Sequence, residues 1–205
     1  MKRTAMMFLL LGLGAPLLAQ AGSTTPAAIS TRELDASLRR ALSGYEPVNA
    51  PRELRSLAAA QGAPAVTEGL LRLLRDAATP GILRLSALEA LGYAPTEAGR
   101  AYLYEVLGQL NSNRPEVADD DRAFTLAAAL RALGSFSAAE MTRLVPYLGH
   151  GNADVREAAA ASLVRCGAPA AEVLPLLHKR LGAETDRGVQ ETLRQGIKTL
   201  TPSPR

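Results

Sequence analysis

The chain has 205 residues, enough for one domain of ordinary size or two small ones, and only 4% are aromatic although 47% are apolar. Because the apolar content is mostly Ala and Leu with few β-branched residues, the composition excludes a β-sandwich or β-barrel and favours helices. The formal net charge is +3, and it falls to +1 when the two basic residues of the predicted signal peptide are removed, because 21 basic and 20 acidic groups remain. No run of five like charges is left in the chain. We therefore expect no nucleic-acid partner.

Residues 1–21 have the pattern of a secretory signal peptide. A basic start is followed by 14 uncharged, mostly apolar residues at 5–18 and by a small-x-small cleavage sequence that ends at Ala21. An uncleaved membrane anchor needs about 20 apolar residues, and this run is shorter and interrupted by glycine and proline. We therefore predict cleavage after Ala21, a periplasmic or secreted bacterial protein, and no stable membrane insertion after cleavage. The Ser/Thr/Pro-rich residues 22–29 are predicted to be a flexible linker.

The first predicted helix of the mature chain spans residues 30–43. Leu34 and Leu38 lie on one narrow apolar stripe, and Ser30 with Glu33 three residues later has the pattern of a capping box. A helix with one apolar stripe and an otherwise polar surface is typical of a cap at the end of a repeat array.

Four units of helix, glycine turn and second helix follow, with a period of about 33 residues. The sequence Ala-Leu-Gly that ends at Gly92 recurs at Gly134, and a polar insertion at 111–120 separates the second unit from the third. The predicted units are residues 51–76, 80–110, 121–149 and 154–182. The glycines that follow their first helices are Gly62, Gly92, Gly134 and Gly167.

Glycine, proline and capping residues give specific expectations inside these units. We expect the glycine after each first helix to adopt the left-handed conformation beyond the last turn. Pro146 and Pro175 lie inside second-helix patterns and should kink or restart those helices. Ser137 with Glu140 predicts a capping box at a helix start. Runs of alanine such as 158–161 would let neighbouring helix pairs approach closely.

The last predicted helix spans residues 187–200. Val189, Leu193 and Ile197 share its apolar face, and its other positions are polar. This helix would cap the second end of the array, and residues 201–205 are predicted to be a disordered tail.

Residues 152–163, NADVREAAAASL, resemble the Val-Arg-x-x-Ala-x-x-Ala-Leu first helix of HEAT-like repeats, in the short form of phycobilisome-lyase-type proteins. The resemblance covers about residues 51–200 and implies an all-α fold, an α-solenoid of about four stacked helix pairs with polar capping helices. It also implies that the arginine of this pattern is a structural link between neighbouring units. The arginines at this position are Arg84, Arg122, Arg156 and Arg187.

Few residues could carry catalytic or metal chemistry. Cys166 is the only cysteine, so no internal disulfide can form, and its place on an apolar helical stripe predicts a buried side chain. His150 and His178 are the only histidines, and neither has a partner at metal-ligand spacing. The acids at 119–121 are consecutive and lack the glycine bend of a calcium loop. We therefore predict no catalytic residue, no metal site and no cofactor.

The leading hypothesis is an exported, monomeric, non-catalytic scaffold that binds another protein along a groove lined by second helices. The candidate residues are tyrosines and basic residues predicted to be exposed there, because tyrosine and arginine are enriched in binding hot spots, although an ordinary solvated helix face is the alternative for them. They are Arg100, Tyr104, Arg143, Tyr147 and Lys179. The insertion at 111–120 offers a competing site. A bilin-lyase-like enzyme or other cofactor-handling protein, implied by the resemblance, is the alternative function, and a structural spacer of the cell envelope is a third.

Overall fold

The computed structural model describes residues 29–43, 50–112 and 120–201. They form ten α-helices and three short 3₁₀ turns, with no strand among them, so the predicted all-α fold is confirmed. The α-helices are α1 (Thr31–Ser43), α2 (Ala50–Gln61), α3 (Ala63–Arg75), α4 (Gly81–Ala90), α5 (Glu97–Ser112), α6 (Asp120–Leu133), α7 (Met141–Leu144), α8 (Ala153–Arg165), α9 (Ala170–Ala183) and α10 (Arg187–Leu200). The 3₁₀ turns are η1 (Leu91–Tyr93), η2 (Ala138–Glu140) and η3 (Val145–Gly149).

Several sequence predictions concern segments outside these ranges. The predicted signal peptide, the linker up to residue 28, the centre of the insertion at 113–119 and the tail at 202–205 lie outside the described residues, so they stay predictions. Within the described ranges, no helix has both the length and the apolar character that crossing a bilayer requires.

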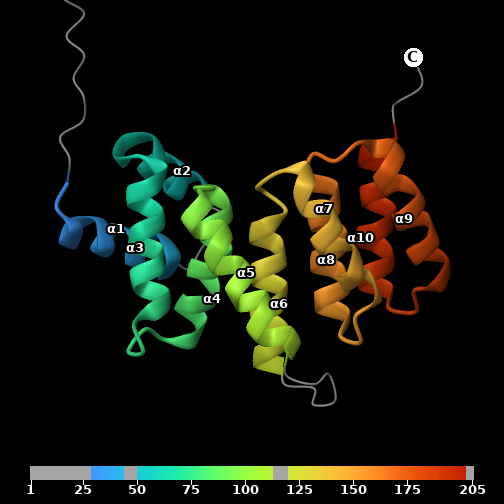
Figure 1. Ribbon diagram of the computed structural model, residues 1–205, viewed down its shortest axis with the longest axis horizontal. Coiled ribbons are helices and arrows are strands. Elements are labelled where there is room, and N and C mark those ends of the chain that lie inside the picture. Colours follow the sequence, from blue (N-terminus) through green and yellow to red (C-terminus); the bar gives the residue numbers. More distant parts are fainter. Residues whose placement is uncertain (1–28, 44–49, 113–119, 202–205) are drawn as a thin grey trace, which may run out of the picture.

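The first helices of the second, third and fourth predicted units, α4, α6 and α8, lie side by side in one row that α10 continues (Figure 1). Helix α6 packs against α4 on one side and against α8 on the other, and α8 in turn packs against α10. Among the second helices, α5 packs on α6, and α9 packs on α10. Helices α6 and α8 therefore each contact the helix before and the helix after them in this row.

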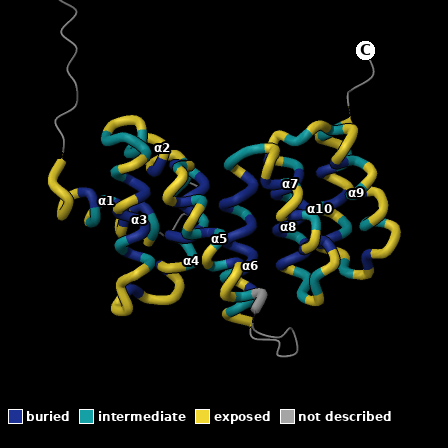
Figure 2. The backbone as a smooth tube through the Cα atoms, in the orientation of Figure 1, coloured by how far each residue is buried: buried dark blue, intermediate teal, exposed yellow. Residues whose placement is uncertain are grey.

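The core follows this row from one end of the described chain to the other (Figure 2). Leu130 of α6 and Leu163 of α8 are at most 1% exposed, and the alanines at 127–129 and 158–160 are buried beside them. Burying one leucine stabilises the fold by roughly 1.5–3 kcal/mol. Cys166 is 4% exposed and its Sγ donates to the carbonyl oxygen of Leu163 at 3.2 Å, so its predicted burial is confirmed.

Glycines after α4 and α6 set how closely the first helices approach each other. A Cβ atom added to Gly92 would lie 2.8 Å from a backbone oxygen of α6, and one added to Gly134 would lie 2.7 Å from the backbone of α8. The predicted left-handed conformation agrees with the positive φ of Gly167 (+76°) and Gly62 (+87°), although the ψ of Gly62 (140°) lies outside the left-handed helical region. The prediction is wrong at Gly92 and Gly134, where glycine is required for contact with the next helix and not for its own backbone angle.

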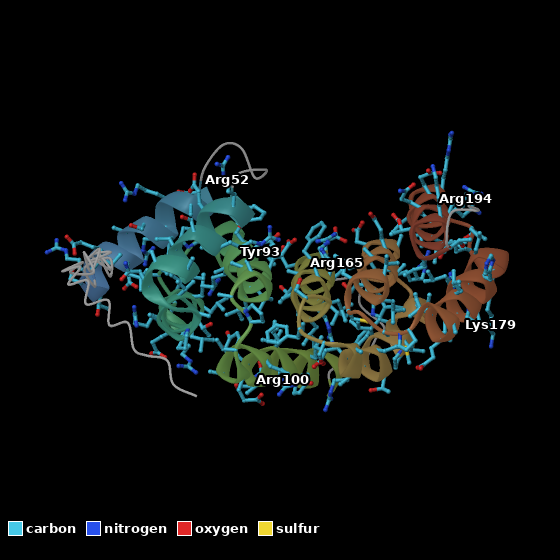
Figure 3. The ribbon with its side chains drawn as sticks, turned by 90° about the horizontal axis from the view of Figure 1, so that it is seen from above. Arg52, Tyr93, Arg100, Arg165, Lys179 and Arg194 are labelled. Carbon is cyan, nitrogen blue, oxygen red and sulfur yellow. The ribbon has the colours of Figure 1, made fainter. Side chains whose placement is uncertain are left out.

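The row of first helices is curved, and the two sides of the curve carry different elements (Figure 3). Tyr93 of η1 and Arg165 of α8 lie on the inner side, whereas Arg100 of α5 lies on the outer side. This differs from the expectation that second helices line the inner side. A physical reason is that glycine contacts shorten the spacing of the first helices, while large side chains such as Tyr104 and Arg143 separate α5 from α7.

Replacing Gly134 by alanine tests whether this close approach stabilises the fold. The added methyl group would overlap the backbone of α8, so we expect the free energy of unfolding to fall by roughly 1–3 kcal/mol. Gly108→Ala is the matched control, because nothing lies within 4 Å of a Cβ added at this exposed position of α5. We expect the control to raise stability by about 0.5–1 kcal/mol. Urea denaturation measures both, and an equal effect at the two positions would contradict the role of Gly134.

Arg156 of α8 links its own unit to the next one. Its guanidinium donates to both carboxylate oxygens of Glu184 at 2.8 Å and to the carbonyl oxygens of His150 and Gly151 at 2.9 Å. Glu184, 5% exposed, also accepts from Arg180 and from the two backbone N–H groups that follow it. The bond from Arg156 is the main reason that the pKa of the Glu184 carboxyl lies well below its usual range. The structural role predicted for this arginine is confirmed.

The arginines at matching repeat positions do not all share that role. Arg84 and Arg187 are exposed, and their side chains form no hydrogen bond or ion pair within the described part of the chain. The prediction that every arginine of the pattern links two units is therefore wrong for these two, because no described carboxylate lies within ion-pair distance of them.

The two prolines inside second helices behave differently. At Pro146 the α-helix ends early, since α7 has four residues and continues as the 3₁₀ turn η3, and the predicted interruption is confirmed. Helix α9 runs unbroken through Pro175, so the helix does not restart there. Pro175 and Ala171, whose carbonyl loses its helical partner, are both exposed, and water can replace the missing bond.

Candidate functional site

An arginine is stacked on a tyrosine where α5 meets α7. The guanidinium carbon of Arg143 lies 3.9 Å from the centroid of the Tyr104 ring. At an exposed site, such a cation–π contact stabilises by roughly 0.5–1 kcal/mol. Arg143 is exposed, and among the described residues no carboxylate forms an ion pair with it. The pair therefore presents a guanidinium group without a described ion-pair partner above an aromatic ring.

A buried carboxylate holds the tyrosine of this pair in place. Glu140 is 1% exposed, and the Tyr104 hydroxyl donates to it, with Oη 2.8 Å from Oε2 and 3.0 Å from Oε1. Arg100 lies 3.7 Å from the same carboxylate and also pairs with Glu97 one turn before it. Burial raises the pKa of the Tyr104 hydroxyl, and the bond to Glu140 raises it further, so the phenol stays protonated as a donor. The ring orientation of Tyr104 is thus fixed from the inside.

The sequence pattern assigns Glu140 a different task. The spacing of Ser137 and Glu140 predicts a capping box, but the Ser137 side chain forms no capping bond, so that prediction is wrong. The carboxylate instead bonds Tyr104 of the preceding unit. A signal that could have identified this role is the placement of Arg100 and Tyr104 four residues apart on one helix face, opposite an acid of the next unit.

An open cavity of about 680 Å³ lies beside the stacked pair. We call it the α5–η3 cavity, and its lining residues are Tyr104, Leu107, Gly108, Thr142, Arg143, Pro146, Tyr147 and His150. Its volume falls in the range of small-ligand pockets, and its mixed apolar and polar lining also suits protruding side chains of a protein. The cavity spans the seam between the second and third predicted units.

His150 borders the cavity in its neutral form. Its Nδ1 accepts a hydrogen bond from the backbone N–H of Asn152 at 3.1 Å, which assigns the ring proton to Nε2. Burial lowers the pKa of His150 below its ordinary value. His178 is exposed on α9. Within the described ranges, no group of three or more His, Cys, Asp or Glu side chains is placed to hold a metal ion.

Four of the five predicted binding residues come together around this cavity. Arg100 and Tyr104 contact the buried carboxylate, while Arg143 and Tyr147 line the cavity wall. Tyr147 is only 8% exposed, so the prediction that it is a surface residue is wrong, because the chain changes from α-helix to 3₁₀ turn just before it and directs it inward. Lys179 is exposed on α9 and does not join this group (Figure 3).

No family model, curated protein or solved structure matches this chain. The contacts and charges around the α5–η3 cavity therefore carry the functional interpretation by themselves.

Proposed function

We propose that the chain is an α-solenoid of HEAT-like repeats that is exported by a bacterium and binds another protein as a monomer, without catalysing a reaction. The successive packing of α4, α6, α8 and α10 supports the solenoid arrangement. The close contacts of Gly92 with α6 and of Gly134 with α8 support it further, since equivalent glycines join successive first helices.

The stacked Arg143–Tyr104 pair at the α5–η3 cavity is the observation that carries the binding proposal. Arginine and tyrosine are the residue types that dominate protein-binding hot spots. Because Glu140 already fixes Tyr104, little side-chain freedom is lost when a partner packs against the ring. A partner side chain would enter the cavity, and a carboxylate or carbonyl group beside it would accept hydrogen bonds from Arg143.

Affinity capture from a bacterial envelope extract, followed by titration of the captured protein, tests this proposal. Arg143→Ala removes the exposed cation and leaves the bond between Tyr104 and Glu140 intact. We expect this variant to bind a stoichiometric protein partner at least about tenfold more weakly, since a hot-spot residue contributes more than 1.4 kcal/mol. Arg187→Ala, which removes an exposed arginine on α10, is the matched control and should bind as the unmodified chain does.

Thermal unfolding of the same variants separates binding from folding. Arg143→Ala should change the stability by no more than about 0.5 kcal/mol, as expected for an exposed residue. Tyr104→Ala is a poorer probe, because it would leave the Glu140 carboxylate buried without its donor. Equal binding by both arginine variants would contradict the placement of the site. A pigment or other small molecule that copurifies in place of a protein would favour the bilin-lyase-like alternative, and capture of nothing would favour a structural spacer.

A further inference from the structure

Three arginines from three different helices surround Tyr93 on the inner side of the curve. We call Arg55 of α2, Arg131 of α6 and Arg165 of α8 the inner arginine cluster. The guanidinium carbon of Arg55 lies 5.5 Å from the centroid of the Tyr93 ring. Burial raises the pKa of the Tyr93 hydroxyl and the charge of Glu89 raises it further, whereas the charges of the three arginines oppose this change. Figure 3 shows Tyr93 and Arg165 on the same side of the row, and Arg165 is bonded to the backbone of Arg131.

Six arginines of the described residues form an ion pair, whereas no described carboxylate pairs with the three arginines of this cluster. Surface arginines such as Arg39 and Arg72 lie within 4.0 Å of an acid, at 3.5 Å and 2.7 Å. Within the described ranges, the inner arginine cluster has no such ion pair, and Glu89 beside it forms none either. The cluster with Glu89 thus has an excess of two positive charges on the inner side.

The geometry of the row places two of these cations at equivalent positions. Arg131 and Arg165 each lie in the last turn of their helix, and α6 packs directly against α8. The Nη2 atom of Arg165 donates to the backbone carbonyl of Arg131 at 3.0 Å, which positions this side chain across the seam between the two helices. An extended polyproline-type chain has three residues per turn, so every third residue of such a chain faces the same side and several carboxylates can face one cluster.

We propose that the inner arginine cluster binds an extended acidic segment of a partner protein, with carboxylates at about every third residue. Planar guanidinium groups bond carboxylates in a bidentate manner, and the half-buried Tyr93 supplies an apolar surface between them. A protein segment fits better than a nucleic acid, because nucleic-acid binding commonly neutralises about six or more phosphates and this cluster offers three cations. This surface is opposite to the α5–η3 cavity and is independent of the function proposed for it (Figure 3).

Fluorescence anisotropy with a labelled peptide of four Glu-Pro-Pro repeats tests the proposal in buffer of about 0.1 M salt. The unmodified chain should bind this peptide saturably and should not bind the Gln-Pro-Pro analogue. We expect Arg55→Gln/Arg131→Gln to weaken binding at least about tenfold. Arg84→Gln/Arg187→Gln removes the same net charge from exposed arginines outside the cluster and should change binding less than about twofold.

A gain of affinity provides a control that misfolding cannot imitate. Glu89→Gln removes the negative charge beside the cluster and should tighten binding of the Glu-Pro-Pro peptide about threefold. Three results would overturn the proposal: no saturable binding, equal weakening in the two double variants, or a single-stranded oligodeoxythymidine that binds more tightly than the peptide through the same arginines. Failure of this test leaves the Arg143 site untouched, since Arg143 lies on another element and contacts none of these residues.

Discussion

Arg156→Ala should lower the free energy of unfolding by about 3 kcal/mol at neutral pH. Removing one partner of a buried ion pair costs about 3–5 kcal/mol, because the remaining charge is left buried without its partner. We expect the lower end of this range, since Glu184 keeps its bonds from Arg180 and from two backbone N–H groups. The substitution also removes the donor that bonds the carbonyl groups of His150 and Gly151. Urea denaturation measures the change, with the same dependence of the unfolding free energy on urea concentration in both proteins.

The pH dependence of the stability difference between Arg156→Ala and the unmodified chain is a control for this prediction. Because the folded pKa of Glu184 lies below its ordinary value of about 4.5, the stabilisation is present above pH 4.5 and is lost as the pH falls below it. The gap between Arg156→Ala and the unmodified chain should therefore shrink in acid. Arg84→Ala, at the matching but exposed repeat position, should change stability by less than about 0.5 kcal/mol at either pH. Equal effects at the two arginines would contradict the linking role of Arg156.

Leu163→Ala is expected to destabilise the chain by roughly 2–5 kcal/mol. This side chain is 1% exposed on α8, which is packed between α6 and α10. Since both neighbours are held by further contacts, the space left by the leucine cannot close completely, and a cavity cost adds to the lost burial. The midpoint of thermal unfolding and the denaturant midpoint should both fall.

An exposed residue of similar size distinguishes burial from a general effect of truncation. Ile82 on α4 is 77% exposed, and Ile82→Ala should alter the free energy of unfolding by no more than about 0.5 kcal/mol. A change below about 1 kcal/mol for Leu163→Ala would show that α8 is not the centre of the packed row.

Local features of the fold could be predicted from the sequence because short-range contacts decide them. The capping box at the start of α1 forms, with the Ser30 N–H donating to Glu33 at 2.8 Å and the Glu33 N–H donating to the Ser30 hydroxyl at 3.3 Å. Helix α10 spans the same residues that its apolar period indicates. The conformations of Gly92 and Gly134 were harder to predict, since glycine after a helix suits both a left-handed turn and a close approach of another helix. Only the position of the neighbouring helix decides between the two.

The candidate site could be predicted only in part. Helical spacing and residue type were enough to select Tyr104 and Arg143, which do contact each other. The partner Glu140 belongs to another unit, and its contact with Tyr104 depends on how two units pack. Tyr147 was misplaced because the start of a 3₁₀ turn changes which face a residue occupies, and the helical period no longer applies beyond it.

The inner arginine cluster could not be predicted from the sequence at all, because it depends on contacts between units. Its members lie on three helices separated by long stretches of sequence, and none belongs to a recognisable local motif. Their convergence on Tyr93 follows from the packing of successive first helices and the curve of the row. Sequence periodicity gives the face of one helix, whereas the curve depends on the contacts between helices.

Titration calorimetry of the captured protein partner against three forms of the chain tests the central claim most directly. The forms are the unmodified chain, Arg143→Ala, and a chain in which residues 113–119 are replaced by Gly and Ser at equal length. The α5–η3 site predicts at least about tenfold weaker binding for Arg143→Ala and unchanged affinity for the replaced insertion. Loss of binding in the insertion variant with an unchanged melting temperature, together with normal binding by Arg143→Ala, would contradict it.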